Sequence, residues 1–469
     1  MTQKVVVDPL NRQNGLARVE VEIEGRTVVE ARIGNANIKG FELLIQGRDP
    51  MDGPFFMQRI CGICSSAHGV AGALAVEDAC RAYVPPNGIL LRNLIFGADS
   101  LQNHLRHFYI LSLPDFAELP DQPPFVPHYR TAPRFSAAET ARLVKNYQAA
   151  VPISRKAHDL LVVFGTRAPH QQAMLAGGVT TPVLADRVMN ATSLLSELRS
   201  FIDAALIPDT ELLASRYPEY YTIGTRPVNL LSYGQFIRHD RPGERYSPAG
   251  AVIDGRREDV DLDSIAEDVS HAWYKDREQP PRHPSQGRTD LADDLSTGYT
   301  FTKAPRYRGL AMEGGPLARA WLRGDYRRGV SVLDRIVTRS LEARQVGEWM
   351  ADWLKALQPG EPGFATPKRR RSASGAGLWD SMRGPLGHWL RIRGGRIVHY
   401  QVVTPSAWNL SPHDGRNRRG PVEEALVGTV IADPENPVEI GRIVRSFDPC
   451  SSCSVQVIDL VEGERGRLQ

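Results

Sequence analysis

Two Cys-x-x-Cys pairs stand near opposite ends of the 469-residue chain: Cys61 and Cys64 in RICGICSSAH, and Cys450 and Cys453 in DPCSSCSVQ. If the fold brings the pairs together, four thiolates form a soft anionic pocket that selects zinc, iron–sulfur, copper(I) or thiolate-bound nickel or iron. The chain has five cysteines, too few and too clustered for the disulfide framework of a secreted protein. The pattern therefore predicts a metal or redox site, and a structural tetrahedral zinc site is one interpretation of it.

The first pair precedes residues 65–83, where apolar residues recur at helical spacing. One of the two serines after Cys64 is expected to cap this helix, which places the thiol at a helix N-terminus, where the dipole favours thiolate. Gly62 is expected to allow a tight backbone between the two thiols. His68 lies four residues after Cys64, so a shared helical face would let its imidazole support the sulfur or bind metal itself; the supporting role is preferred.

The remaining pattern predicts an α+β protein with a mainly α-helical bundle core and small β elements at both ends. Residues 3–33 alternate apolar and polar side chains, with a turn at Glu24-Gly25, and predict a β-hairpin. The C-terminal third is expected to be β-rich at residues 390–405 and 425–433. Helical spacing of apolar residues predicts long helices at residues 65–83, 89–113, 137–161, 182–206 and 330–357. The apolar face expected for the last helix consists of Leu333, Val337, Leu341, Val346, Met350, Trp353 and Leu357.

Two stretches, about 237–299 and 358–378, are rich in charged residues, Gly and Pro and are predicted to be irregular surface excursions. The basic run Lys368–Arg371 is expected to face solvent. A net charge of +3 on so long a chain gives no electrostatic case for a nucleic-acid or membrane partner. No signal peptide and no membrane-spanning segment are expected from the apolar pattern.

Several segments, in this order, resemble the large subunit of nickel–iron hydrogenases. They are DPLNRQNGLARVEVEIEG, GFELLIQGRDP, RICGICSSAH, SLQNHLRHFYILSLPD, APHQQAMLAGGVT, GPLGHWLRI, YQVVTPSAWNLSP and DPCSSC. The resemblance runs from about residue 8 to residue 456 and implies a single catalytic domain over residues 1–456. It favours a nickel–iron centre over structural zinc.

The resemblance implies that Cys61 and Cys450 bind nickel alone, and that Cys64 and Cys453 bridge nickel to an iron carrying carbonyl and cyanide ligands. Dihydrogen is a very weak acid, so splitting it requires a Lewis acid that takes the hydride beside a base that takes the proton. The implied base is the terminal thiolate of Cys450. The implied reaction is reversible oxidation of H2 to protons and electrons.

Arg383, in DSMRGPLGHW, is implied to lie over the open coordination position. A guanidinium stays protonated, so we expect it to polarise and position the substrate rather than act as the base. The family more often has glutamate, alanine and proline before this arginine, and Asp380 and Met382 depart from that pattern. Ser406, after the proline of VTP, is implied to hydrogen-bond an iron-bound cyanide.

Two positions lack a carboxylate found in other members of this family. Asn14 stands where many have a glutamate that relays protons away from the nickel thiolate, and an amide cannot relay a proton by titrating. Asn103 stands where some have an aspartate. We expect water or another carboxylate, with Asp448 beside Cys450 as the candidate, to take over, or turnover to be slower.

The resemblance implies a magnesium site that includes Glu42 and residue 456. Family members often have histidine there; this chain has Gln456, whose carbonyl oxygen suits a hard cation. Residues 457–469 match in place a tail that a dedicated protease removes after nickel insertion. We expect such maturation, with nickel chaperones, although the histidine that commonly precedes the cut is absent. An ordinary C-terminal strand is the alternative.

Oxidation of H2 releases two electrons, which this chain cannot carry away alone. With four thiols committed to the metals, only Cys80 is left, and it is expected to be a buried small apolar residue. Iron–sulfur clusters are therefore expected in a small subunit that docks permanently on this chain. Both a cytoplasmic location and export through a signal on the partner are compatible with the sequence.

Two other functions stay open at this stage. One is a hydrogen sensor, in which the same centre turns over slowly and signals to another protein; Asn14 and Asn103 favour it. The other is a metal-free scaffold like the quinone-reducing core subunit of respiratory complex I. The presence of all four paired cysteines argues against the scaffold.

Overall fold

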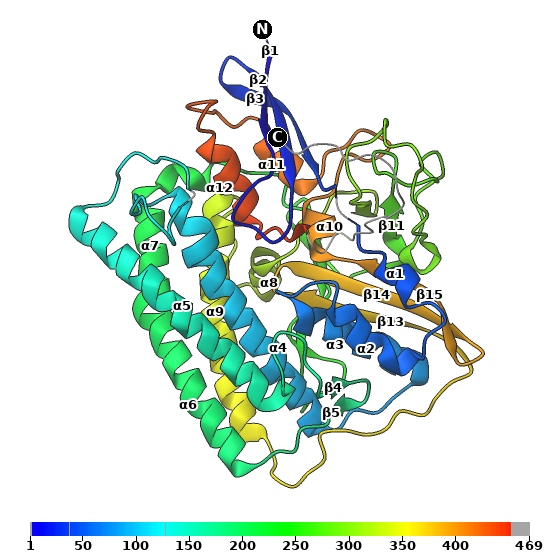
Figure 1. Cartoon of the computed structure of the whole chain (residues 1–469). Coiled ribbons are helices and arrows are strands. Elements are labelled where there is room, and N and C mark those ends of the chain that lie inside the picture. The colour runs from blue at the N-terminus through cyan, green and yellow to red at the C-terminus, as the bar shows by residue number, and fades with distance from the viewer. Residues whose placement is uncertain (1, 37, 127, 452–469) are drawn as a thin grey trace.

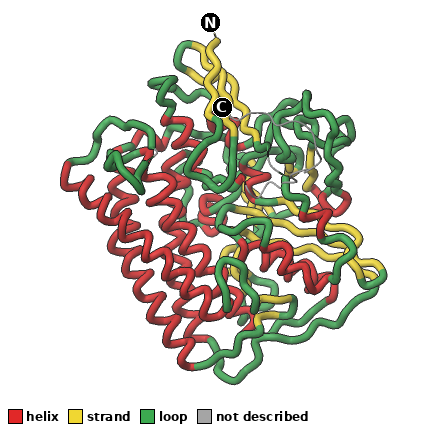
Figure 2. The backbone as a smooth tube through the Cα atoms, viewed as in Figure 1, coloured by secondary structure: helices red, strands yellow, loops and turns green. Residues whose placement is uncertain are grey.

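Four long helices pack side by side along one flank of the molecule (Figures 1 and 2). The computed structural model describes residues 2–36, 38–126 and 128–451. Helix α4 (Pro86–Arg106) contacts α5 (Ala137–Gly165) and α9 (Val332–Ala356), and α6 (Ala185–Phe201) contacts the same two helices. The bundle core and the α+β class are confirmed.

The longest helix, α5, begins where its sequence specifies a cap. The Ser136 side chain accepts the backbone N–H of Glu139, and the Glu139 carboxylate accepts the N–H of Ser136 at 2.8 Å. This reciprocal pair satisfies two backbone donors that the first helical turn would leave without partners.

Helix α9 buries most of the predicted apolar face, with Leu333, Val346, Met350, Trp353 and Leu357 in the core, and it also buries charged residues that the prediction left out. Leu341 is 38% exposed, whereas Arg335, Arg339 and Glu342 are buried. These three side chains recur at helical spacing and point charge into the interior, where each finds a partner of opposite charge. The prediction was wrong for Leu341 because the pattern was judged by apolar residues alone.

The described residues form three three-stranded antiparallel sheets, one of which joins β10 (Arg256–Glu258), β9 (Gly250–Ile253) and β6 (Leu230–Ser232). Another joins β1 (Thr2–Val7), β2 (Arg18–Glu24) and β3 (Thr27–Gly34), so the predicted hairpin is confirmed and gains a strand. The third joins β13 (Ser372–Ser381), β14 (Gly384–Arg393) and β15 (Arg396–Val403).

Strand β13 overlaps the predicted excursion 358–378, so that prediction was wrong from Ser372 onward. Helix α3 (Ser65–Cys80) lies directly on this strand. A Cβ atom at Gly377 would overlap the backbone oxygen of Ala71, and one at Gly375 would overlap that of Ala75. The glycines that looked like loop residues are required by close helix–strand packing.

Predicted strand 425–433 was also wrong. Helix α11 (Pro421–Leu426) occupies its start, and only an isolated bridge between Thr27 and Val430 follows. Within the predicted excursion 237–299, short strands interrupt the irregular chain.

Cys80, the last residue of α3, is buried as expected.

The other helices are α1 (Phe41–Leu44), α2 (Gly53–Gln58), α7 (Ile207–Arg216), α8 (Pro316–Arg323), α10 (Pro405–Asn409) and α12 (Val438–Ser446). The other strands are β4 (Met174–Leu175), β5 (Gly178–Val179), β7 (Gln235–Ile237), β8 (Arg245–Ser247), β11 (Ile265–Asp268) and β12 (Ala304–Tyr307). In the described part of the chain, no helix combines the length and apolar character needed to cross a bilayer.

Candidate metal centre

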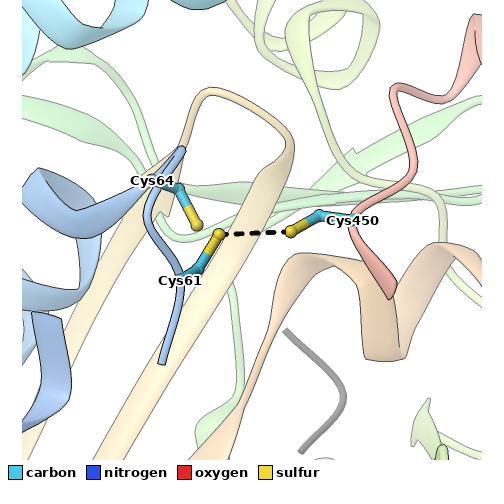
Figure 3. A group of neighbouring side chains, drawn as sticks. All are labelled: Cys61, Cys64 and Cys450. Atoms are coloured by element: carbon cyan, nitrogen blue, oxygen red, sulfur yellow. Dashed lines mark hydrogen bonds between the residues drawn. The ribbon is translucent and has the colours of Figure 1, made fainter. Parts of the chain in front are cut away.

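Three of the four paired cysteines meet in the interior. The Sγ atoms of Cys61, Cys64 and Cys450 all lie within 4.8 Å of one another, and all three residues are buried (Figure 3). The Sγ atoms of Cys61 and Cys450 are 3.3 Å apart although 389 positions separate them in the chain. The predicted convergence of the two chain ends is present for these three residues, and Cys453 lies outside the described residues.

Local structure around the first pair differs from the expectation. Cys64 is itself the N-cap of α3, and neither serine after it caps the helix. The Ser65 hydroxyl donates to the backbone oxygen of Pro169 at 2.5 Å, and the Ser66 hydroxyl donates to Asp99. Gly62 does not have a positive φ, and a Cβ there would meet nothing. The predicted position of Cys64 at a helix N-terminus is correct, and the predicted serine cap is wrong. Residues 62–63 do form a turn between the two thiols, but neither φ nor lack of space requires glycine at position 62.

Asn14 connects the two ends of the chain at the sulfurs. Its Nδ2 donates to Sγ of Cys61 at 3.3 Å and to Sγ of Cys450 at 3.2 Å, and its backbone forms a parallel bridge with Cys450. Amide N–H groups that donate to sulfur favour thiolate over thiol. The amide therefore stabilises negative charge on the two sulfurs.

Ser406 contacts the backbone of Cys450. Its Oγ accepts the backbone N–H of Cys450 at 3.1 Å, and its hydroxyl hydrogen is left to donate elsewhere. The residue is fixed by the start of α10, where the Thr404 side chain accepts the N–H of Ala407. This capping turn places a buried hydroxyl beside the cysteine cluster.

Arg383 occupies a two-residue turn between β13 and β14, closed by the pairing of Ser381 with Gly384. Its Nε donates to the backbone oxygen of Asp448 at 2.8 Å, and one terminal nitrogen donates to Oδ1 of Asn103 at 2.6 Å. Burial alone would lower its pKa, but Asp448 and the cysteine sulfurs raise it above the usual value. Arg383 is therefore a fixed cation, as predicted.

The Asp448 carboxylate lies between two buried arginines. Oδ1 is 3.2 Å from Arg383, and Oδ2 accepts from Arg339 at 3.2 Å and from Nδ2 of Asn103 at 2.7 Å. Burial alone would raise the pKa of Asp448, but Arg383 and Arg339 hold it far below its usual value. Arg339 was not found by sequence reasoning; a charged residue on the buried face of a helix was the available signal.

A second buried ion-pair network supports the Arg383 turn. Arg319 makes a bidentate pair with Glu342, with both distances 2.7 Å, and binds Asp380 at 2.9 Å. Arg319 also donates to the backbone oxygens of Ser381 and Met382. Asp380 thus has a defined structural role, and the network holds the turn with Met382 at its first position.

His68 belongs to a buried chain of rings. Its Nδ1 is 3.1 Å from Nε2 of His388, whose Nδ1 is 2.9 Å from the Tyr400 hydroxyl. Burial lowers the pKa of His68 to about 4, so the ring is neutral at physiological pH. Nε2 of His68 has no hydrogen-bond partner within the described ranges. A neutral, anchored imidazole agrees with a supporting role.

Glu42 belongs to a second group of buried charged side chains, with Lys303 and Glu267. Burial raises its pKa, Lys303 opposes that rise, and Glu267 adds to it. Its Oε2 lacks a hydrogen-bond partner among the residues that the structure describes. A buried carboxylate oxygen of this kind fits a hard cation. Gln456, the other predicted ligand, lies outside the described residues.

Three buried thiols with N–H donors and a nearby fixed cation suit a soft metal. Zinc and nickel–iron sites share such thiolates, so sulfur positions alone do not choose between them. The choice comes from comparison with known proteins. The model of the family described as nickel-dependent hydrogenase matches residues 39–122 and 118–456.

Relatives of this chain match almost end to end. The large subunit of the periplasmic [NiFeSe] hydrogenase of Desulfomicrobium baculatum is 34% identical over 98% of this chain and 96% of its own length. The hydrogenase-1 large chain of Escherichia coli K12 is 31% identical over 97% of this chain and 95% of its own length.

Solved structures agree with the sequence comparisons. The reduced Ni-Fe-Se hydrogenase from D. vulgaris Hildenborough has a TM-score of 0.94 at 33% identity, over 97% of this chain and all of the matched one. An H2-activated [NiFeSe]-hydrogenase from Dm. baculatum gives 0.93 at 35% identity, with the same coverage. The chain therefore belongs to the nickel-dependent hydrogenase family, as a hydrogenase large subunit.

Proposed function

We propose that this chain is the catalytic subunit of a nickel–iron hydrogenase that oxidises H2 reversibly and passes the electrons to an iron–sulfur partner subunit. The observation that carries the proposal is the convergence of Cys61, Cys64 and Cys450, from opposite ends of the chain, at mutual distances within 4.8 Å. The family match supports nickel as the metal.

The two cysteine pairs have distinct roles in this proposal. Cys61 and Cys450 hold nickel, and Cys64 and Cys453 hold nickel and iron together. When bound, the metal pair, its iron carrying carbonyl and cyanide, supplies a Lewis acid for H2 and an electron acceptor. Ser406 would hydrogen-bond an iron-bound cyanide, because its hydroxyl oxygen accepts the N–H of Cys450 and its own hydrogen can be donated to a cyanide nitrogen.

Proton acceptance is assigned to the sulfur of Cys450. The amide of Asn14 donates to this sulfur and stabilises the thiolate before the proton arrives. Arg383 cannot act as the base, because Asp448 and the sulfurs keep its guanidinium protonated. Its fixed positive charge instead polarises and orients H2 beside the cluster, and Asn103 and Asp448 set its direction.

Magnesium is proposed at Glu42 together with Gln456. The support is the buried Oε2 of Glu42, which has no hydrogen-bond partner among the described residues and is acted on by the charges of Lys303 and Glu267. Residues 457–469 are proposed to be a maturation peptide that a protease removes after nickel insertion. The mass of the C-terminal peptide of mature protein would test this: a chain that still ends at Gln469 would contradict it.

A cluster-bearing partner follows from the electron count. In the described part of the chain, Cys61, Cys64 and Cys450 are the only group of three or more closely spaced side chains that could bind a metal ion. The relatives are named as large subunits or large chains of hydrogenases. We propose an iron–sulfur small subunit as the permanent partner.

The test is H2 oxidation by the complex purified from its native host, measured with an artificial electron acceptor and with nickel and iron quantified. Sustained turnover that disappears in Cys450→Ser supports the proposal. The amide at Asn14 favours the sensor as the second candidate, since it cannot titrate. Full nickel and iron loading with negligible turnover would overturn the proposed enzyme and favour the sensor.

A further inference from the structure

Protons must leave a buried centre, and its nearest polar groups are poorly suited to carry them. Asn14 contacts both sulfurs but has an amide, which does not gain or lose protons at neutral pH. The Asp448 carboxylate is paired with Arg339 and Arg383. The reaction proposed above therefore needs another exit, and this inference rests on that proposed function.

A chain of three side chains begins two residues after Cys64 and leads to the surface. Ser66 is two residues after Cys64 in α3, and its hydroxyl donates to Oδ2 of Asp99 in α4. Oδ1 of Asp99 is 3.9 Å from Nε2 of His158 in α5. Ser66 and Asp99 are buried, whereas the His158 side chain is 32% exposed. The three residues span three neighbouring helices, from the interior to solvent.

Asp99 is on the same helix as a residue that contacts the centre. Asn103, one helical turn further along α4, shares its face and binds both Asp448 and Arg383. The charged or titratable groups around Asp99 are His158 on α5, Arg106 on α4 and His170 after α5. Burial raises the pKa of Asp99, and His158, Ser66 and Arg106 oppose that rise without cancelling it.

We propose that Ser66, Asp99 and His158 form a proton exit from the nickel–iron centre that replaces the relay lost at Asn14. Asp99 and His158 carry the proton, and Ser66 connects them to the cluster side. None of the three touches H2 or a metal in this proposal, so each acts by moving a proton after the reaction.

The relay moves one proton from the cluster to solvent in a chain of coupled bond changes. The O–H bond of protonated Asp99 breaks, and an N–H bond forms at Nε2 of His158, which releases its own proton to solvent. The carboxylate left on Asp99 takes the hydroxyl proton of Ser66. Ser66 simultaneously takes the proton that the S–H bond of Cys450 releases, carried between the two residues by bridging water. The Cys450 thiolate and the Ser66 hydroxyl are thereby restored, and one proton has moved outward.

A structural ion pair is the competing explanation of the same contacts. Such a pair would hold Asp99 ionised against His158 at hydrogen-bond distance. The observed 3.9 Å is too long for a direct hydrogen bond and suits a bridging water or a small ring movement. The two explanations differ in one observable: the relay requires a protonated carboxyl at Asp99 in the resting protein.

The first test therefore uses infrared difference spectroscopy of the intact complex, which reads protonation without turnover. The carbonyl band of a protonated carboxylic acid should be present in the wild type at neutral pH and absent in Asp99→Asn. Asp414→Asn is the control and should keep the band. Asp414 is another buried carboxyl, and burial alone would raise its pKa, but a hydrogen bond from the backbone of Arg418 and the charge of Arg306 hold it below the usual value. Identical spectra of wild type and Asp99→Asn in this region would overturn the relay.

The second test measures H2 oxidation and exchange of D2 with solvent protons in the same complexes. Asp99→Asn should lower both by about tenfold or more, the scale of lost proton-transfer catalysis, with nickel and iron content unchanged. His158→Ala should be slow and recover with added imidazole, because its position is partly open to solvent. Lys156→Ala, on the same helix and paired with Glu197, is the matched control and should match wild type.

Wild-type rates in Asp99→Asn, or a slow His158→Ala that imidazole does not restore, would overturn the relay while leaving the hydrogenase assignment intact. An inactive wild-type complex with full nickel and iron would instead remove the proposed function, and the relay with it.

Discussion

Replacing Glu342 with glutamine tests whether a buried ion pair holds the Arg383 turn in place. Glu342 receives two N–H bonds from Arg319, both 2.7 Å long, and the two side chains are 1% and 0% exposed. Arg319 in turn donates to the backbone oxygens of Ser381 and Met382, directly before Arg383. Glu342→Gln should therefore lower stability and also loosen the arginine over the metal centre.

The size of the stability loss depends on the ion pair with Asp380 that Arg319 keeps in the variant. Removing one partner of a buried ion pair costs about 3–5 kcal/mol of unfolding free energy. Asp380 still binds Arg319 at 2.9 Å in the variant, so the guanidinium is not left without a counter-charge. We expect a loss of about 3 kcal/mol, at the lower end of that range. This is a large fraction of the roughly 5–15 kcal/mol that stabilises a typical protein.

The pH dependence has a definite sign. Burial alone would raise the pKa of Glu342, but Arg319 and then His104 hold it well below the usual 4.5. Ionised Glu342 thus contributes stability that is fully present above pH 4.5 and is lost as the pH falls through its folded pKa. The stability gap between wild type and Glu342→Gln should be constant near neutral pH and narrow below pH 4.5.

The assay is denaturant unfolding followed by tryptophan fluorescence, with H2 oxidation measured in parallel. Asp203→Asn is the matched control, because Asp203 pairs with Arg344 of the same helix α9 at 3.0 Å, but with side chains 54% and 41% exposed. It should lose less than about 1 kcal/mol. Equal losses in the two variants, or a gap that widens in acid, would refute the ion-pair argument.

Three further outcomes are expected. Cys450→Ser should abolish H2 oxidation and leave most of the fold intact, and wild-type-like activity would refute its assignment as nickel ligand and base. Asn14→Glu should leave the rate of H2 oxidation equal or higher if proton exit limits turnover. A large loss of that rate would show that the hydrogen bonds from the amide to the two sulfurs contribute more than a titratable carboxylate at this position. Gly377→Ala should unfold or strongly destabilise the protein, since its Cβ would overlap the oxygen of Ala71; Gly62→Ala, with open space around its Cβ, should keep the melting temperature of wild type.

Much of the helical framework was predictable because apolar residues at a spacing of 3.6 report a buried face directly. The cysteine pairs were predictable for another reason: few structures other than metal sites need paired thiols in a long chain. The resemblance then supplied roles for Arg383 and Ser406, and the structure places Ser406 and the Arg383–Asp448 pair around the cysteine cluster.

The features that sequence reasoning missed involve residues whose partners are distant in the chain. Arg339 and Glu342 look like solvent-facing charges until Asp448 and Arg319 are brought to them by folding. Gly377 looks like a loop residue until α3 packs on its strand. Local propensity carries no information about such long-range pairing.

Elemental analysis combined with nickel X-ray absorption on the purified native complex tests the central claim most directly. The account predicts one nickel and one iron per large subunit, with sulfur donors at nickel, and loss of nickel in both Cys61→Ser and Cys450→Ser. Zinc in stoichiometric amount, or nickel retained with unchanged sulfur ligation in either variant, would contradict it.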